Sequence, residues 1–239
     1  MASLKIEGRK EELETFVRWA DHLRRVDRFH LPEDDEQLIE RIVDYSIKHR
    51  PNDLGMDRPL YRVRINEIDG QAKPSSKMGA TPSHLARPGR MNPLGIPYLY
   101  VALEQGTAIA EVRPWVGALL SVASLVPQRT LRVVNLNYRD VKPPEMQVQT
   151  GEEQEYLAFL LFISQSLARP QNPNDELSYI PTQYFAEKFK RHGVDGIIYL
   201  SVLQKPGSNL VLFDINSAVV KGVTLHKVQS VSLSTAQVS

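Results

Sequence analysis

The chain has 239 residues, of which 42% are hydrophobic and 24% are charged, as is typical of a globular protein with one domain or two small ones. Its formal net charge of +1 provides no overall field that would recruit nucleic acid or an anionic membrane. The absence of cysteine excludes disulfide bridges, thiolate metal sites and cysteine nucleophiles.

The first 57 residues predict a helical extension. Apolar residues recur at helical spacing in two stretches within residues 9–50, and Pro32 with the acidic residues after it suits the start of the second helix. Residues 50–55 then predict a linker or turn, because Pro, Asn, Asp and Gly are concentrated there. The sequence leaves open whether this extension packs on the rest of the chain or offers a surface to a partner.

Strand patterns begin after the extension. Residues 60–65 alternate and are rich in strand-forming side chains, which predicts a strand. Residues 66–95 are rich in Gly, Pro, Ser and Lys and predict a long loop, and such loops are commonly functional or disordered. A second strand is predicted over residues 98–102, followed by a short helix over residues 107–112 with Thr107 near its N-cap.

The second half of the chain continues this mixture of strands and helices. Apolar patterns predict strands over residues 119–125 and 131–136 and a helix over residues 152–168 with one apolar side. A further helix is predicted to start near Thr182 and to stop before Gly193.

Two more strands are predicted over residues 197–200 and 210–213, joined by a hairpin-like turn. From residue 226 the chain is polar and rich in Ser and Thr, so we expect a frayed tail. The predicted organisation is therefore a helical extension over residues 1–57, a mixed α/β (α+β) domain over residues 58–225 and a tail over residues 226–239.

Several common functional classes find no support in the sequence. There is no Gly-rich dinucleotide or P-loop motif, no HExxH and no GxSxG. The six histidines lack metal-ligand spacing, so no metal site is predicted, and only His84 is kept in view because it lies in the long loop. No apolar run approaches the roughly 20 residues that span a bilayer, and the N-terminus lacks the apolar core of a signal peptide. We therefore expect a cytoplasmic protein that binds neither a membrane nor, given its balanced charge, nucleic acid directly.

Three polar residues stand out against their apolar surroundings. Arg62 lies in the first predicted strand, Glu111 in an Ala-rich run, and Ser201 directly after a buried strand. A glutamate among Ala, Ile and Val must be exposed, paired or functional. Its ordinary interpretation is a helix-surface residue that pairs with Arg113.

Short motifs around these residues are spread over residues 60–213. They are YRVR at 61–64, GRMNPLG at 89–95, LY at 99–100, AIAEV at 108–112, PTQ at 181–183, GIIYLS at 196–201 and NLVLF at 209–213. In their order and spacing they resemble the RES domain family, which is named for an Arg, a Glu and a Ser. One departure is Met91, because the family often has an aromatic residue after the arginine of this turn.

The resemblance implies a mixed α/β fold similar to that of ADP-ribosyltransferases and diphtheria-type toxins. Characterised members of the family degrade NAD at the nicotinamide glycosidic bond by phosphorolysis or hydrolysis, some transfer ADP-ribose to a protein, and many are the toxin of a toxin–antitoxin pair. The chain is accordingly expected to be an NAD phosphorylase or glycohydrolase, with protein ADP-ribosylation as the variant activity. A non-catalytic nucleotide-binding or interaction module is the competing hypothesis.

The resemblance also implies the small molecules and partners. NAD would be a substrate rather than a cofactor, no resident cofactor is expected, and inorganic phosphate is a candidate co-substrate. An antitoxin protein and a second copy of this chain are the candidate partners.

The catalytic residues that the resemblance implies are Glu111, Arg62 and Ser201. Glu111 would stabilise positive charge on the ribose, and no general acid is required because nicotinamide leaves as a neutral molecule from a pyridinium cation. Arg62 and Arg90 would hold the pyrophosphate or a phosphate through bidentate hydrogen bonds. Ser201 would orient the substrate and is not expected to be a nucleophile, because no histidine neighbours it in sequence.

A second set of residues is implied to bind the substrate. Tyr100 would pack on nicotinamide or bind a ribose through its hydroxyl, and strand alternation places Tyr98 on the same face. Alternation likewise places Arg64 on the face of Arg62. The full set is Arg90, Tyr100, Tyr61, Arg64, Gln183 and Asn209.

Overall fold

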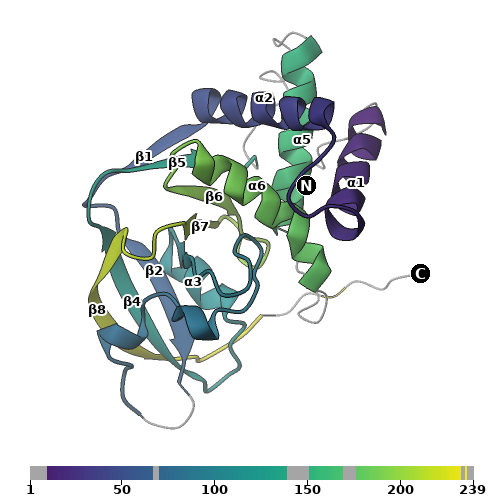
Figure 1. Ribbon diagram of the computed structural model, residues 1–239. Helices are drawn as coiled ribbons and strands as arrows, with labels where there is room; N and C mark the ends of the chain where they lie inside the picture. Colours follow the sequence, from purple (N-terminus) through teal and green to yellow (C-terminus); the bar gives the residue numbers. More distant parts are fainter. Residues whose placement is uncertain (1–9, 67–69, 139–150, 169–175, 233–234, 236–239) are drawn as a thin grey trace.

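The computed structural model describes residues 10–66, 70–138, 151–168, 176–232 and 235. Figure 1 shows the helices α1, α2, α5 and α6 gathered together against one part of a curved sheet, with the short helix α3 lying against another part of it. The mixed α/β class expected from the sequence is therefore confirmed, with the N-terminal helices packed on the domain.

The described strands form one eight-stranded sheet in the order β1-β5-β6-β7-β3-β2-β4-β8. All neighbouring strands are antiparallel except β5 and β6, which run parallel. The strands are β1 (Pro51–Leu54), β2 (Leu60–Ile65), β3 (Leu99–Ala102), β4 (Leu119–Pro127), β5 (Leu131–Asn135), β6 (Gly196–Leu200), β7 (Ser208–Leu212) and β8 (Ala218–Lys227).

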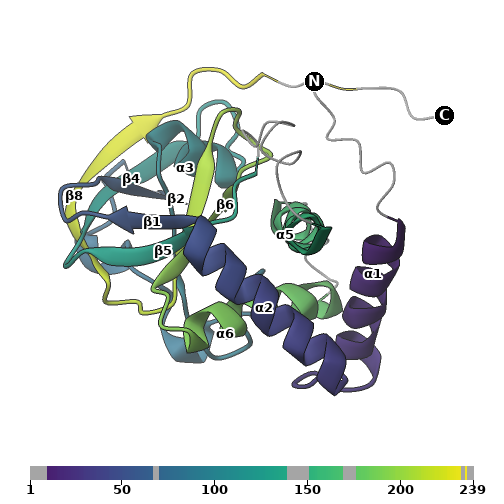
Figure 2. The same cartoon turned by 90° about the horizontal axis from the view of Figure 1, so that it is seen from above.

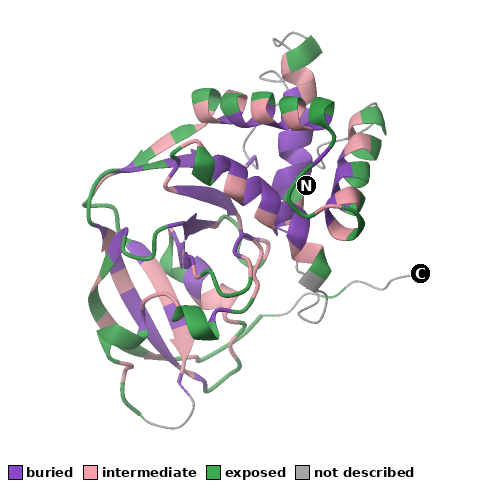
Figure 3. Ribbon diagram, viewed as in Figure 1, coloured by how far each residue is buried: buried purple, intermediate pink, exposed green. Residues whose placement is uncertain are grey.

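Helix α5 (Gly151–Ala168) lies at the centre of the helical side. Figure 2, which views α5 end-on, shows it between α1, α2 and the sheet, and Figure 3 shows buried residues along most of its length. The expectation of a single apolar side is wrong, because 11 of its 18 residues are buried, including every one from Tyr156 to Ser164. A helix that is apolar all round is one that is surrounded by protein.

The two N-terminal helices, α1 (Lys10–Arg25) and α2 (Glu33–His49), cover α5 and α6 (Ile180–Arg191). Trp19 of α1 is 1% exposed and stacks on Phe159 of α5 with ring centroids 4.7 Å apart. Lys188 of α6 is buried and pairs with Glu36 and, at 2.7 Å, with Glu40 of α2. These contacts answer the question left open by the sequence, since the extension packs on the rest of the chain.

Two strands were not predicted. Residues 50–55 were expected to be a linker, yet β1 pairs with β5 from Pro51↔Val134 to Leu54↔Leu131, which shows that sheet pairing overrides the turn-forming composition. Strand β8 pairs with β4 and includes His226 and Lys227. It lies at the edge of the sheet and most of its residues are not buried, so its sequence lacks a strong apolar alternation.

Helix α3 (Gln105–Glu111) packs over β2, β3, β4 and β7 and ends at Glu111. It begins two residues earlier than predicted, so Thr107 is not its N-cap. Instead the Thr107 hydroxyl donates to the Glu104 carboxylate at 2.8 Å, and the same carboxylate accepts from the Ser208 amide at 2.9 Å. The start of α3 is thereby fixed to the start of β7.

The long predicted loop between β2 and β3 contains two short 3-10 turns, η1 (Ser75–Lys77) and η2 (Ser83–Leu85). The predicted hairpin is confirmed, since β6 and β7 pair antiparallel from Gly196↔Leu212 to Leu200↔Ser208. None of the described helices is long and apolar enough to cross a lipid bilayer.

The packing of α1 on α5 predicts a large stability effect at Trp19. Trp19→Ala removes a fully buried aromatic side chain, and we expect it to lower the free energy of unfolding by roughly 3–5 kcal/mol in urea titrations. The matched control is Trp115→Ala, because the Trp115 side chain is 60% exposed. We expect that variant to stay within about 0.5 kcal/mol of the parent protein. Equal effects at the two positions would contradict the packing of the N-terminal helices.

Candidate active site

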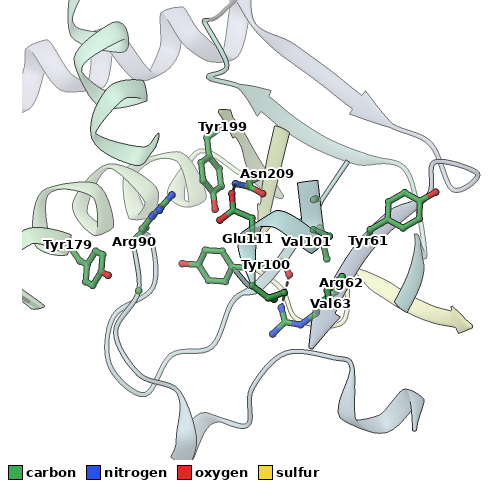
Figure 4. A pocket seen from close by; sticks show the side chains of 14 residues that line it. Tyr61, Arg62, Val63, Arg90, Tyr100, Val101, Glu111, Tyr179, Tyr199 and Asn209 are labelled. Carbon is green, nitrogen blue, oxygen red and sulfur yellow. Dashed lines mark hydrogen bonds between the residues drawn. The ribbon is translucent and has the colours of Figure 1, made fainter. Parts of the chain in front are cut away.

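A cavity opens where the sheet separates between β2 and β3. These two strands pair at a single position, Tyr61↔Ala102. Beyond it, the Arg62 side chain bridges the strands, with its Nη1 donating to the Tyr100 carbonyl at 2.6 Å. The cavity has a volume of about 370 Å³, within the range of small-molecule sites, and is drawn in Figure 4.

Six of the nine site residues expected from the sequence line this cavity, and three do not. The lining residues are Tyr61, Arg62, Arg90, Tyr100, Glu111 and Asn209. Arg64, Gln183 and Ser201 lie outside the lining and act through neighbours, as described below. His84, which lies in η2, is not part of the lining either.

Glu111 is held by two side chains from the β6–β7 hairpin. Its Oε1 accepts hydrogen bonds from Ser201 Oγ at 2.8 Å and from Asn209 Nδ2 at 2.7 Å. Within the described part of the chain no donor reaches Oε2. The alternative of a surface glutamate paired with Arg113 does not hold among these residues, because the carboxylate is directed to Ser201 and Asn209 instead.

Ser201 is fully buried and its hydroxyl is committed to the protein. Besides donating to Glu111, Oγ accepts from the amides of Leu203 and Gln204 at 3.3 Å each. The side chain therefore fixes the orientation of the Glu111 carboxylate and does not reach the cavity.

Arg62, on β2, is partly buried and carries an N–H donor without a hydrogen bond to the described protein. Arg62 Nε is buried and has no hydrogen-bond partner among the described residues. Burial, and then the charge of Arg64, lower the pKa of Arg62 to about 10, so the guanidinium remains charged at neutral pH. Among the described residues, no carboxylate forms an ion pair with Arg62, Arg64 or Arg90. The cavity wall thus carries positive charge that the described protein groups do not neutralise.

The side chains of Tyr61 and Arg64, which flank Arg62 on β2, lie on opposite faces of the strand. The regular pairing of β2 with β4 keeps Arg64 on the face of Arg62, as expected, and Arg64 Nη2 donates to the Gly79 carbonyl at 3.2 Å. Tyr61 faces the opposite way, and Figure 4 shows its ring directed away from Glu111 and Tyr100. Arg64 therefore braces the loop before β3, and Tyr61 forms only the edge of the cavity.

Arg90 is carried by a loop, residues 87–96, that Asn92 and Tyr100 hold in shape. Asn92 Nδ2 donates to the carbonyls of Arg87, Pro93 and Ile96 at 3.0, 3.2 and 3.1 Å. The Tyr100 hydroxyl donates to Asn92 Oδ1 at 2.9 Å and accepts from the Met91 amide at 3.1 Å. Burial raises the pKa of Tyr100 to about 12. The hydroxyl is thus occupied by the loop, which leaves the ring of Tyr100 to line the cavity.

The same loop is anchored to the helices. Gln183 Nε2 donates to the carbonyls of Gly89 and Asn92 at 2.9 Å each, and the Thr182 hydroxyl donates to the Arg90 carbonyl. Arg90 Nη1 donates to the Leu167 carbonyl at 2.8 Å, near the C-terminus of α5, where the last carbonyls of a helix lack partners within the helix. Gln183 is therefore a support of the Arg90 loop rather than part of the cavity wall.

Two tyrosines of the lining were missed by the sequence analysis. Tyr199 lies on β6 and Tyr179 ends the 3-10 turn η3 (Glu176–Tyr179). Strand alternation offered a signal for Tyr199, since it lies two residues before Ser201 and so shares its direction. No local pattern indicated Tyr179. The described residues include no group of three His, Asp or Glu side chains that could hold a metal ion.

Comparison with known families decides the classification. The family model of the RES domain matches residues 59–235, which is most of the chain. This chain belongs to the RES domain family. No curated protein matches it. Among solved structures, a chain of the M.tuberculosis MbcT-MbcA toxin-antitoxin complex aligns at 12% identity and a TM-score of 0.45, covering 80% of this chain and 93% of that one.

The Arg90 loop of this RES protein depends on the absence of a side chain at Gly89. A Cβ built there would lie 2.4 Å from Asn92 Oδ1 and 3.2 Å from the Tyr100 hydroxyl. Gly89→Ala must therefore displace the side chains that hold the loop, and we expect it to cost about 1–3 kcal/mol of unfolding free energy in urea titrations.

The control for this prediction lies in the same long connection of the RES domain. Gly79→Ala adds a Cβ with nothing within 4 Å, so its stability should match that of the parent protein. A Gly89→Ala variant as stable as Gly79→Ala would show that the described packing of the loop is wrong.

Proposed function

We propose that this RES protein cleaves the N-glycosidic bond between nicotinamide and ribose in NAD. The observation that carries the proposal is the Glu111 carboxylate, which has one oxygen held by Ser201 and Asn209 and the other open, in a cavity whose arginines have no acidic partner among the described residues. Membership of the RES domain family supports the same activity.

The chemistry suits a single carboxylate. When the bond between ribose C1′ and the pyridinium nitrogen breaks, its electron pair goes to nitrogen, so nicotinamide leaves as a neutral molecule. Positive charge then develops on the ribose, and no proton has to be supplied to the leaving group. A preorganised anion beside the ribose lowers the barrier of such a step because its position is fixed before the reaction. Glu111 is the residue in the cavity that meets this requirement.

The arginines suit the other end of the substrate. The pyrophosphate of NAD carries negative charge, and guanidinium groups bind phosphate oxygens through short, charge-assisted hydrogen bonds. Arg62 and Arg90 both line the cavity and both lack acidic partners in the described structure. The ring of Tyr100 offers an aromatic surface on which nicotinamide would pack.

The site is compatible with several acceptors of the ADP-ribosyl group. Phosphate, water and a protein side chain all attack the same electron-poor carbon, so the charge stabilisation by Glu111 serves each of them. We propose phosphate or water as the acceptor. Loss of NAD would make the protein toxic to its cell, in line with the toxin–antitoxin role that the family resemblance implies, and an antitoxin is the corresponding partner.

The carboxylate is tested by Glu111→Gln. The glutamine carbonyl can still accept from Ser201 and Asn209, so the side chain keeps its position and loses only its charge. We expect turnover of NAD to fall by at least about 100-fold while the affinity for NAD, measured by calorimetry, stays close to that of the parent.

The control for this variant is Glu33→Gln, because Glu33 is exposed on α2, far in sequence from the cavity residues. It should cleave NAD at the parent rate. Equal activity of Glu111→Gln and the parent protein would remove Glu111 from the mechanism.

The acceptor is tested by product analysis. Purified protein is incubated with NAD, with and without inorganic phosphate, and products are identified by mass spectrometry. ADP-ribose-1″-phosphate formed only with phosphate identifies a phosphorylase, and free ADP-ribose in its absence identifies a glycohydrolase. Mass added to a protein would identify a transferase instead, and intact NAD in every reaction would contradict the proposed cleavage and favour a binding module.

A further inference from the structure

Tyr199 places an unused hydroxyl in the cavity. The residue is only 4% exposed and belongs to the lining of the cavity. Among the described residues, none forms a hydrogen bond with its hydroxyl. The hydroxyl is not one of the fully buried unpaired polar atoms of the described residues, so it reaches the cavity and is open to a ligand there. A polar group of that ligand would give it a hydrogen-bond partner.

The surroundings of this hydroxyl define what it can bind. Figure 4 shows it directed toward the side chains of Glu111 and Asn209. Burial raises the pKa of Tyr199, with Arg90 opposing this shift and Tyr100 and Glu111 adding to it. The hydroxyl therefore stays protonated at neutral pH and is available as a hydrogen-bond donor beside the carboxylate.

Two other tyrosines differ from Tyr199. The Tyr100 hydroxyl, in the same cavity, is occupied by Asn92 and Met91. Tyr138 is an equally buried residue, at 4% exposure, and no described residue is a partner of its hydroxyl, but it is not part of the cavity. Tyr138 packs against Arg50, whose guanidinium lies 4.8 Å from its ring centre. Of these three tyrosines, Tyr199 alone combines a cavity position with an unpaired hydroxyl.

We propose that Tyr199 is a substrate-binding residue whose hydroxyl donates a hydrogen bond to a hydroxyl group of the nicotinamide ribose. The inference rests on the proposed function, because Glu111 stabilises the reacting ribose only if that sugar lies beside it. The nicotinamide ribose then lies next to the open oxygen of Glu111, and the Tyr199 hydroxyl is directed toward the same place. The sugar offers two such acceptors, its 2′- and 3′-hydroxyls.

The test is a cycle that removes each partner of this hydrogen bond in turn. Tyr199→Phe and the parent protein are compared on NAD and on two NAD analogues, whose nicotinamide ribose lacks either the 2′- or the 3′-hydroxyl. On NAD we expect Tyr199→Phe to lower kcat/KM about two- to tenfold, the effect of a neutral hydrogen bond. On one of the two analogues the same substitution should have no effect, because the acceptor is already missing.

Tyr138→Phe is the matched control. It removes the hydroxyl of an equally buried tyrosine outside the cavity, so its kcat/KM on all three substrates should equal that of the parent. Unfolding curves of both variants establish that neither change alters the fold.

Each outcome decides the inference. A penalty for Tyr199→Phe on NAD that vanishes on one analogue supports it and identifies the ribose hydroxyl. The same penalty on NAD and on both analogues, or no penalty on NAD, would overturn it while leaving the cleavage of NAD established. If the parent protein leaves NAD intact, the proposed function fails and the assignment of Tyr199 fails with it.

Discussion

The hydrogen bonds that hold the Glu111 carboxylate connect α3 to the β6–β7 hairpin, and the candidate site depends on them. They join the last residue of α3 to side chains that lie 90 and 98 residues further along the chain. For them to form, α3 must lie across the sheet next to β7, and the β6–β7 hairpin must bring Ser201 and Asn209 to one place. The pairing of β6 with β7 over five positions provides that rigidity. A carboxylate fixed in this way does not have to reorganise when charge develops near it, which is the physical basis of electrostatic catalysis.

The positive side of the cavity depends on a different set of contacts. Arg90 is presented by a loop that is tied to α6 through Gln183 and to α5 through the Leu167 carbonyl. Helices α5 and α6 are in turn covered by α1 and α2, with Trp19 on Phe159 and Lys188 between Glu36 and Glu40. The N-terminal helices therefore contribute to the site without touching it, because they stabilise the supports of the loop.

The cavity holds charge and polarity that a purely structural core would avoid. Among the described residues, the buried Arg62 Nε has no hydrogen-bond partner, and the Tyr199 hydroxyl lines the cavity without one. The Arg62 Nε lowers the stability of the unliganded protein, since its desolvation is not compensated by a new hydrogen bond. Unsatisfied groups that converge on one cavity are the expected signature of a binding site, where the ligand supplies the missing partners.

The sequence by itself determined the class of the fold, most of its strands and helices, and six of the residues that line the cavity. Periodicity reports which side of a local segment is buried, so β2, β3, α2 and the β6–β7 hairpin could be recognised from their own residues, and Glu111 stood out because its neighbours are apolar. Composition misled where distant pairing overrides local preference, as in β1, and where an edge strand lacks an apolar pattern, as in β8. Only the tertiary structure decided that Ser201 and Gln183 support other groups, that the Tyr100 hydroxyl is occupied, and that Tyr199 joins the cavity. Those roles depend on which distant segments meet, and a local pattern carries no record of its remote partners.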